Sequence, residues 1–218
     1  MKQIAIVHTV QSVADTFWKQ LKDYLGTEVK IYNLWDQFLS VNPNEVGEFT
    51  QNNKNRLFLD IKNAELTGAD VIVVSCSTLT PHLGLIRPYI SVPVIAIDDA
   101  MTKKAVETGS RILVCATAGS TIQPTTDKLM EDAEKAGKKI TVDQMVVTEA
   151  YKAMQAADMP KHDRILTEAM KEVRGFDCIV LAQASMAGCE EAIQKETGIR
   201  TFSSPKLCME LVKETLGL

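Results

Sequence analysis

The feature that most constrains the fold is a segment that occurs twice. ADVIVVSCSTLTP (residues 69–81) lies over FDCIVLAQASMAG (residues 176–188) at an offset of 107 positions. In each copy an apolar run ends abruptly in small, mostly polar side chains. Such a run is typical of a strand that is buried on both faces of a parallel sheet. The repetition predicts that the chain is built from two similar α/β halves.

Other parts of the chain repeat in the same order. The predicted strands at 2–7 and 111–116 lead into Thr9 and Thr117, which are 108 positions apart. The segments KAVETG and VKETLG also correspond loosely near the ends of the two halves. Several matches in one order indicate an internal duplication. In this duplication, Cys76 of the first half corresponds to Gln183 of the second half.

The remaining periodicity predicts alternating strands and helices. Val13, Phe17, Leu21 and Leu25 recur at four-residue spacing, which is typical of an amphipathic helix. We expect helices at about 12–25, 44–67, 98–108, 124–136 and 162–173, strands at 28–34, 71–74, 92–97 and 140–146, a loop at 42–44, and N-cap roles for Asp98 and Asp99.

Composition excludes several classes of protein. The 218 residues include 24 basic and 28 acidic side chains, a net charge of −4, without a basic stripe for nucleic acid. No apolar stretch approaches the roughly 20 residues of a membrane span, and the N-terminal residues do not resemble a signal peptide. The five cysteines form no CxxC pair, and the three histidines form no metal-binding motif. We therefore expect a reduced, cytoplasmic protein without a bound metal.

Cys76 is the candidate reactive residue. It follows the predicted strand at 71–74, and open α/β sheets bind their ligands beyond the carboxyl ends of their strands. A lone cysteine is often a small core residue, and we assign that role to Cys115, Cys178 and Cys208. The neighbouring polar residues favour a reactive role for Cys76.

Small residues with free backbone N–H groups are candidates for binding a carboxylate. The turn at 117–121 resembles the turns that hold anions before a helix, although a simple capped loop is the alternative. Thr9 occupies the matching position in the first half. The candidate binding residues are Thr9, Ser77, Thr78, Thr117, Ala118, Gly119, Ser120, Thr121, Gln183 and Ser185.

Three motifs carry a resemblance to a known family. With the order of strands and helices, SCST (75–78), ATAGST (116–121) and VLAQASMAG (180–188) resemble the cofactor-independent aspartate/glutamate/hydantoin racemase superfamily. The resemblance implies two pseudo-symmetric α/β lobes, Rossmann-like or flavodoxin-like, each with a short parallel sheet flanked by helices. It also implies an active site between the lobes, a last helix that returns to the first lobe, no pyridoxal phosphate or other cofactor, and a homo-oligomer. We expect lobes at 1–97 plus 205–218 and at 98–204.

The chain departs from the two-cysteine pattern of these racemases. In the family, one thiolate removes the proton α to a carboxylate and a second thiol supplies a proton to the opposite face. The second position here is Gln183, whose amide is neither an acid nor a base near neutral pH. Two helper positions, an aspartate and a histidine in glutamate racemases, are His8 and Ser185. This pattern argues against an ordinary glutamate racemase.

Several roles remain open at the second position. Gln183 either orients the substrate, donates to an enediolate oxygen, or fills space. His8 is a possible second proton donor because histidine titrates near neutral pH, or it is a structural residue. Cys189, six residues beyond Gln183, is another possible donor.

The sequence thus predicts a racemase- or isomerase-type enzyme that acts at the carbon α to a carboxylate. Cys76 would be its acid, base or nucleophile, and a small carboxylate or amide its substrate. One alternative is a single-cysteine decarboxylase or lyase that resembles arylmalonate decarboxylase. Another is a non-catalytic carboxylate-binding homologue. A redox-sensing thiol is less well supported, because Cys76 lacks a nearby resolving cysteine.

Overall fold

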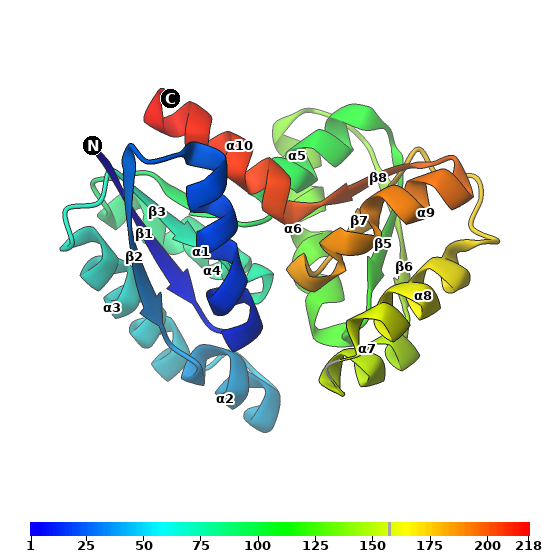
Figure 1. Ribbon diagram of the computed structural model, residues 1–218, viewed down its shortest axis with the longest axis horizontal. Helices are drawn as coiled ribbons and strands as arrows, with labels where there is room; N and C mark the ends of the chain where they lie inside the picture. Colours follow the sequence, from blue (N-terminus) through cyan, green and yellow to red (C-terminus); the bar gives the residue numbers. More distant parts are fainter. Residues whose placement is uncertain (157) are drawn as a thin grey trace. The chain divides into compact units, whose positions relative to one another are not determined.

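The computed structural model describes residues 1–156 and 158–218, and these form two compact units. Unit 1 contains Met1–Ile97 and Cys208–Leu218, and unit 2 contains Asp98–Leu207. Each unit has a four-stranded parallel sheet flanked by helices (Figure 1). The predicted α/β fold with two similar lobes is confirmed. Within the described residues, no helix is both long and apolar enough to cross a membrane.

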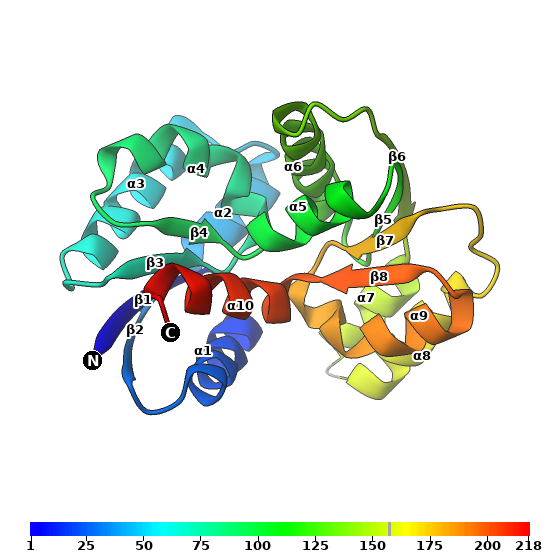
Figure 2. The same cartoon turned by 90° about the horizontal axis from the view of Figure 1, so that it is seen from above.

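Unit 1 has the strand order β2-β1-β3-β4, and all of its neighbouring strands are parallel. Its strands are β1 (Lys2–His8), β2 (Val29–Trp35), β3 (Val71–Val74) and β4 (Val94–Ala96). Its helices are α1 (Gln11–Leu25), α2 (Phe38–Val46), α3 (Gln51–Glu65), α4 (Thr80–Ile86) and most of α10 (Ser204–Leu216), with the 3₁₀ turns η1 (Ser77–Leu79) and η2 (Arg87–Tyr89). Figure 2 shows α3 and α4 on one face of the sheet and α1 on the other. All of β3 is fully buried between these layers.

Unit 2 repeats this arrangement with the strand order β6-β5-β7-β8. Its strands are β5 (Arg111–Ala116), β6 (Thr141–Val146), β7 (Cys178–Leu181) and β8 (Arg200–Ser203). Its helices are α5 (Asp99–Thr108), α6 (Ile122–Lys135), α7 (Thr148–Gln155), α8 (Met159–Met170) and α9 (Glu190–Thr197), with the 3₁₀ turns η3 (Gly119–Thr121) and η4 (Ala184–Cys189). Helices α5 and α6 cover one face of the sheet, and α8 and α9 cover the other (Figure 2).

The register of the two sheets confirms the internal duplication. In unit 1, Ile4 pairs with Val71 at the start of the β1–β3 ladder. In unit 2, Ile112 pairs with Cys178 at the start of the β5–β7 ladder. These pairs are related by the offsets of 108 and 107 positions found in the sequence. Residues that follow the paired strands therefore occupy equivalent places in the two units.

The backbone beyond the strands also repeats. Ser75 N donates to Val7 O at 3.0 Å, as Ala182 N donates to Cys115 O at 2.9 Å. One residue further on, the carbonyl of Cys76 accepts from Leu79 N at 3.1 Å. The carbonyl of Gln183 likewise accepts from Met186 N at 3.0 Å. Cys76 and Gln183 thus stand on the same local backbone, so the difference between the two sites lies in the side chains.

The helix predicted at 44–67 is wrong in its extent. The structure has two helices there, because Gly47 ends α2 in the left-handed conformation (φ +82°). Thr50 then starts α3 with a capping box to Asn53. The predicted loop at 42–44 is also wrong, since α2 runs through Pro43. The short helix α7 was not predicted.

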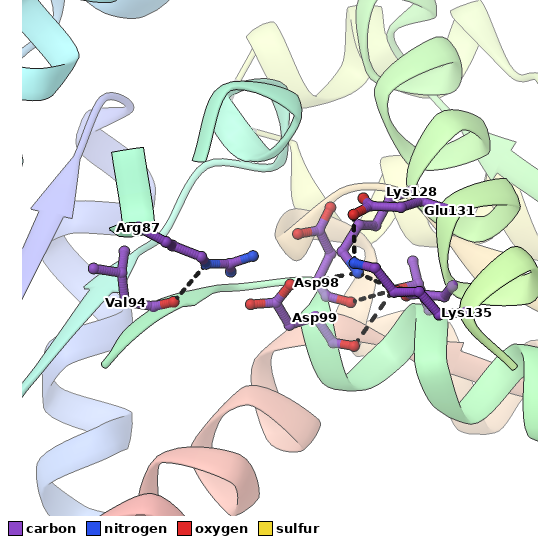
Figure 3. Close-up of polar contacts among 9 residues, drawn as sticks. Arg87, Val94, Asp98, Asp99, Lys128, Glu131 and Lys135 are labelled. Atoms are coloured by element: carbon purple, nitrogen blue, oxygen red, sulfur yellow. Dashed lines mark hydrogen bonds and ion pairs between the residues drawn. The ribbon is translucent and has the colours of Figure 1, made fainter. Parts of the chain in front are cut away.

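A buried lysine joins the two helices on one face of unit 2. Lys128 of α6 lies 3.5 Å from the carboxylate of Asp99 in α5 (both labelled in Figure 3). It also pairs with Asp132, one turn further along α6. Thr102 Oγ1 donates to the second oxygen of Asp132 at 2.7 Å. Asp98 occupies the N-cap position of α5, but its side chain makes no capping hydrogen bond. In unit 1, Arg87 Nε donates to Val94 O at 2.9 Å, holding η2 on β4 (Figure 3).

Candidate active site

Cys76 lies just beyond β3, at the N-cap position of η1. Its Sγ is 2.9 Å from Thr78 Oγ1, so either atom can donate a hydrogen bond to the other. Cys76 is half-buried, whereas the other four cysteines of the chain are buried. This combination of partial exposure and a hydroxyl neighbour suits a thiol that exchanges protons with a ligand.

Three of the other cysteines, Cys115, Cys178 and Cys189, lie in surroundings that favour the neutral thiol. Burial raises the pKa of Cys115 and of Cys178 to about 12. Burial also raises the pKa of Cys189, and the hydrogen bond to Asp163 adds to the effect. A thiol in an apolar site reacts slowly because its thiolate is desolvated.

His8 connects three strands of unit 1. Its ring is fully buried, with Nδ1 2.8 Å from Ser75 Oγ and Nε2 3.0 Å from Asn33 Oδ1. Burial lowers the pKa of His8, while the hydrogen bond to Asn33 opposes that shift. To donate a proton to a ligand, the ring would have to give up one of these hydrogen bonds. Asn33, which lies in β2 two residues before its end, was not singled out in the sequence.

Cys189, at the end of η4, forms a cluster with His162 and Asp163, in which the cysteine and the histidine are buried and the aspartate is half-buried. Its Sγ donates to Asp163 Oδ1 at 3.2 Å, and His162 Nδ1 lies 2.7 Å from the same oxygen. The three side chains have metal-ligand atoms within 4.8 Å of one another. A single carboxylate oxygen takes both of these hydrogen bonds, so the thiol and Nδ1 have partners without a cation. No sequence motif revealed the group, because 26 positions separate Asp163 from Cys189.

The first-half binding candidates lie at the ends of β1 and β3. Thr9 is 1% exposed, and among the described residues its Oγ1 has no hydrogen-bond partner. Ser77 and Thr78 are half-buried in η1 beside Cys76. A buried hydroxyl without a partner costs free energy, so an oxygen or nitrogen of a ligand at Thr9 would be stabilising.

The equivalent turn of unit 2 is filled by a side chain. Gln183 Oε1 accepts hydrogen bonds from Thr117 N at 2.6 Å, Thr117 Oγ1 at 3.0 Å and Ala118 N at 3.0 Å. Thr117 is 1% exposed and Gln183 is half-buried. We refer to the three donors of Thr117 and Ala118 as the donor cradle. The structure therefore brings three of the predicted binding residues together, but around an oxygen of the protein itself.

The remaining candidates of unit 2 lie around the donor cradle. Thr121 Oγ1 donates to Ala118 O at 2.9 Å and closes the turn. Gly119 and Ser120 are exposed at the start of η3, and Ser185 is half-buried in η4.

Comparison with known proteins defines the family. The family model described as Asp/Glu/Hydantoin racemase matches residues 39–212. The chain therefore belongs to the Asp/Glu/hydantoin racemase family. A comparison with curated protein sequences gives no significant match.

Solved structures show the same fold at low sequence identity. An aspartate racemase homologue from Pyrococcus horikoshii is 16% identical, with a TM-score of 0.71 and all of both chains covered. Allantoin racemase from Klebsiella pneumoniae is 15% identical, with a TM-score of 0.69 over 100% of this chain and 88% of that one. An arylmalonate decarboxylase is 12% identical, with a TM-score of 0.64 over 99% and 92%. At these identities the likeness concerns the fold.

Proposed function

We propose that this protein is a cofactor-independent isomerase-type enzyme that makes and quenches a carbanion at the carbon α to a carboxylate. Cys76 is its acid, base or nucleophile. The observation that carries this proposal is the placement of Cys76. It is the cysteine that is not buried, and it lies at the carboxyl end of a central parallel strand beside Thr78. Membership of the racemase family supports the same class of chemistry.

The proposed proton transfer needs a base and donors for the developing charge. The Cys76 thiolate takes the α-proton and becomes a thiol, and the electron pair of the C–H bond moves into the carboxylate as an enediolate. Hydrogen-bond donors that are already aimed at the oxygens stabilise such an intermediate. Thr9, Ser77 and Thr78 are the candidate hydroxyls of unit 1 near the ends of β1 and β3. Return of a proton to carbon completes the cycle.

Exchange of the α-proton with solvent deuterium tests the proposal. The native protein is incubated in D₂O with amino acids, hydantoins, malonates and maleate, and the substrates are followed by NMR. We expect exchange or turnover of one substrate class, and its loss in Cys76→Ala. Cys208→Ala, at a buried cysteine, is the matched control. Exchange that persists undiminished in Cys76→Ala would contradict the proposal.

Gln183 favours a second candidate, a decarboxylase or lyase that protonates one face. An amide at the equivalent of Cys76 leaves the two-thiol mechanism without its second thiol. Cys189, with its thiol bonded to Asp163, and His8, held by two hydrogen bonds, are the proposed alternative donors. A product of one configuration, deuterated at the α-carbon, would support the single-face enzyme. A racemic product that needs Cys189 or His8 would support the racemase.

A carboxylate-binding protein without catalysis is the remaining candidate. It predicts that small carboxylates raise the melting temperature of Cys76→Ser as much as that of the native protein, with no proton exchange in either. We also propose that the protein acts in the cytoplasm as a homo-oligomer on a small carboxylate or amide. Sedimentation velocity tests the oligomer, and a monomer at every concentration would contradict it.

A further inference from the structure

The donor cradle of unit 2 has the composition of an anion site. Two consecutive backbone N–H groups and one hydroxyl converge on a single oxygen at 2.6–3.0 Å. Converging N–H groups of this kind bind carboxylate and phosphate oxygens in proteins. The oxygen in place is Oε1 of Gln183, which carries a partial rather than a full negative charge.

Unit 1 shows the same turn without such an occupant. Thr9 corresponds to Thr117, and Cys76 corresponds to Gln183. The Cys76 thiol contacts Thr78. The hydroxyl of Thr9, although buried, has no partner within the part of the chain that the structure describes. The duplicated turn thus has one copy with an unused hydroxyl and one copy whose hydroxyl is bonded to Gln183.

We propose that Gln183 is an internal ligand that closes a carboxylate site in unit 2. Its carboxamide oxygen occupies the position of a carboxylate oxygen, so a small carboxylate binds Thr117 and Ala118 only when that side chain is shortened or displaced. The choice of a carboxylate rests on the proposed function. The closed site itself rests on the three hydrogen bonds and on the duplication.

This role explains why an amide is suitable at the position. A glutamine is long enough for its Oε1 to reach the turn after the neighbouring strand, as the three distances show. It also accepts hydrogen bonds from two backbone N–H groups, which would otherwise stay unsatisfied at a cost in free energy. A competing carboxylate has to replace all three hydrogen bonds, and the released amide must be solvated. Carboxylate recognition by the native chain is therefore assigned to unit 1.

Backbone amide signals of the full-length protein test the closed site. The native protein and Gln183→Ala are titrated with acetate and with malonate, and the ¹⁵N–¹H signals of Thr117 and Ala118 are followed. We expect these signals to shift saturably in Gln183→Ala at a carboxylate concentration at least ten times lower than in the native protein. Gln194→Ala is the matched control, because Gln194 Oε1 also accepts from a backbone N–H of unit 2, that of Thr201. We expect no gain of binding at Thr117 or Ala118 in that control.

Two results would overturn the proposal. One is that the native protein and Gln183→Ala respond equally at Thr117 and Ala118. The other is that neither signal moves in the folded variant. The readout is binding rather than turnover, so it can fail while proton exchange at Cys76 succeeds, and the reverse also holds.

Gln183→Glu provides a second test if the alanine variant does not fold. The new carboxylate would accept from the same three donors, which favours its ionised form. We expect its pKa to lie below the ordinary value of about 4.3, measured by ¹³C NMR of the side-chain carboxyl. A pKa at or above that value would show that the donor cradle does not favour an anion and would overturn the proposal.

Discussion

The ends of β3 and β7 are two copies of one structural site with different chemistry. The strand pairs β1–β3 and β5–β7 have equivalent registers, and the backbone N–H groups of Ser75 and Ala182 make equivalent hydrogen bonds. In unit 1 the site has a half-buried thiol and a threonine hydroxyl that has no partner among residues 1–156 and 158–218. In unit 2 an amide oxygen fills the corresponding turn. The comparison teaches that a duplicated scaffold can keep its backbone while one side chain decides whether a site is open or closed.

The largest expected difference between the two units is in thiol reactivity. Cys76 is half-buried, whereas Cys115 and Cys178 are buried with their pKa values raised to about 12. We expect iodoacetamide to modify Cys76 at least ~100-fold faster than either buried thiol, because the thiolate is the nucleophile. Peptide mass spectrometry of a time course at pH 7.5 measures this. Faster labelling of Cys178 than of Cys76 would contradict this predicted order of reactivity.

Removing the amide oxygen from unit 2 is expected to reduce stability. Gln183→Leu leaves Thr117 N, Thr117 Oγ1 and Ala118 N without their acceptor. Leaving buried donors unsatisfied costs about 2–3 kcal/mol in the free energy of unfolding. Cys76→Ala removes one contact to Thr78, and we expect a loss below about 1 kcal/mol. Urea unfolding of the two variants compares these values. Equal losses would show that Gln183 is no better bonded than Cys76.

A third prediction concerns the start of the central strands, where Asp70 Oδ2 of unit 1 accepts from Gln3 N at 2.7 Å. Asp177 Oδ2 accepts from Ser110 N and Arg111 N, at 2.6 Å and 2.8 Å. A Cβ on Gly109 would stand 2.1 Å from Asp177 Cβ. Relieving this overlap with Asp177 should lower the free energy of unfolding of Gly109→Ala by about 1–3 kcal/mol. Gly119→Ala is the matched control, because nothing lies within 4 Å of its added Cβ. Thermal melts that fall equally for both variants would contradict this assignment.

The smallest expected effect is a pH dependence specific to unit 1. Burial raises the pKa of Asp60 to about 7, helped by Asp36 and opposed by Arg56. Because the pKa is higher in the folded state than in the unfolded state, this contribution to stability is complete below about pH 4 and is lost as the pH rises through 7. We expect Asp60→Asn to be more stable than the native protein at pH 8, by on the order of 1 kcal/mol after solvent screening.

The difference in the free energy of unfolding between Asp60→Asn and the native protein should be smaller at pH 5 than at pH 8. Guanidinium unfolding at the two pH values measures it. A constant difference across this range would show that Asp60 does not titrate as described.

Much of the fold was predictable because it depends on patterns that are local in sequence. The apolar runs of β3 and β7 identified buried strands, and the repeat through Thr9 and Thr117 identified their equivalence. Short helices such as α4 and α7 have too few turns for a clear period. The break between α2 and α3 depends on a single left-handed glycine, Gly47.

The position of the candidate site was easier to predict from the sequence than the contacts between its side chains. The placement of Cys76 at the end of a strand follows from one apolar run. The contact of Gln183 with Thr117 joins residues 66 positions apart and depends on which rotamer the amide adopts. The sequence allowed a binding, orienting or filling role for Gln183, and its three donors are revealed only by the structure. The meeting of Cys189 with Asp163 is equally non-local, because it depends on the packing of α8 against η4.

The division of the chain has a consequence for the order of folding. Unit 2 is one continuous segment, Asp98–Leu207, whereas unit 1 needs Cys208–Leu218 in addition to Met1–Ile97. During synthesis from the N-terminus, unit 2 is complete while unit 1 still lacks its final segment. Domains generally fold as units when their residues become available. Unit 2 therefore leaves the ribosome ahead of Val212 and Leu216, both buried, which complete the half of the molecule that carries Cys76.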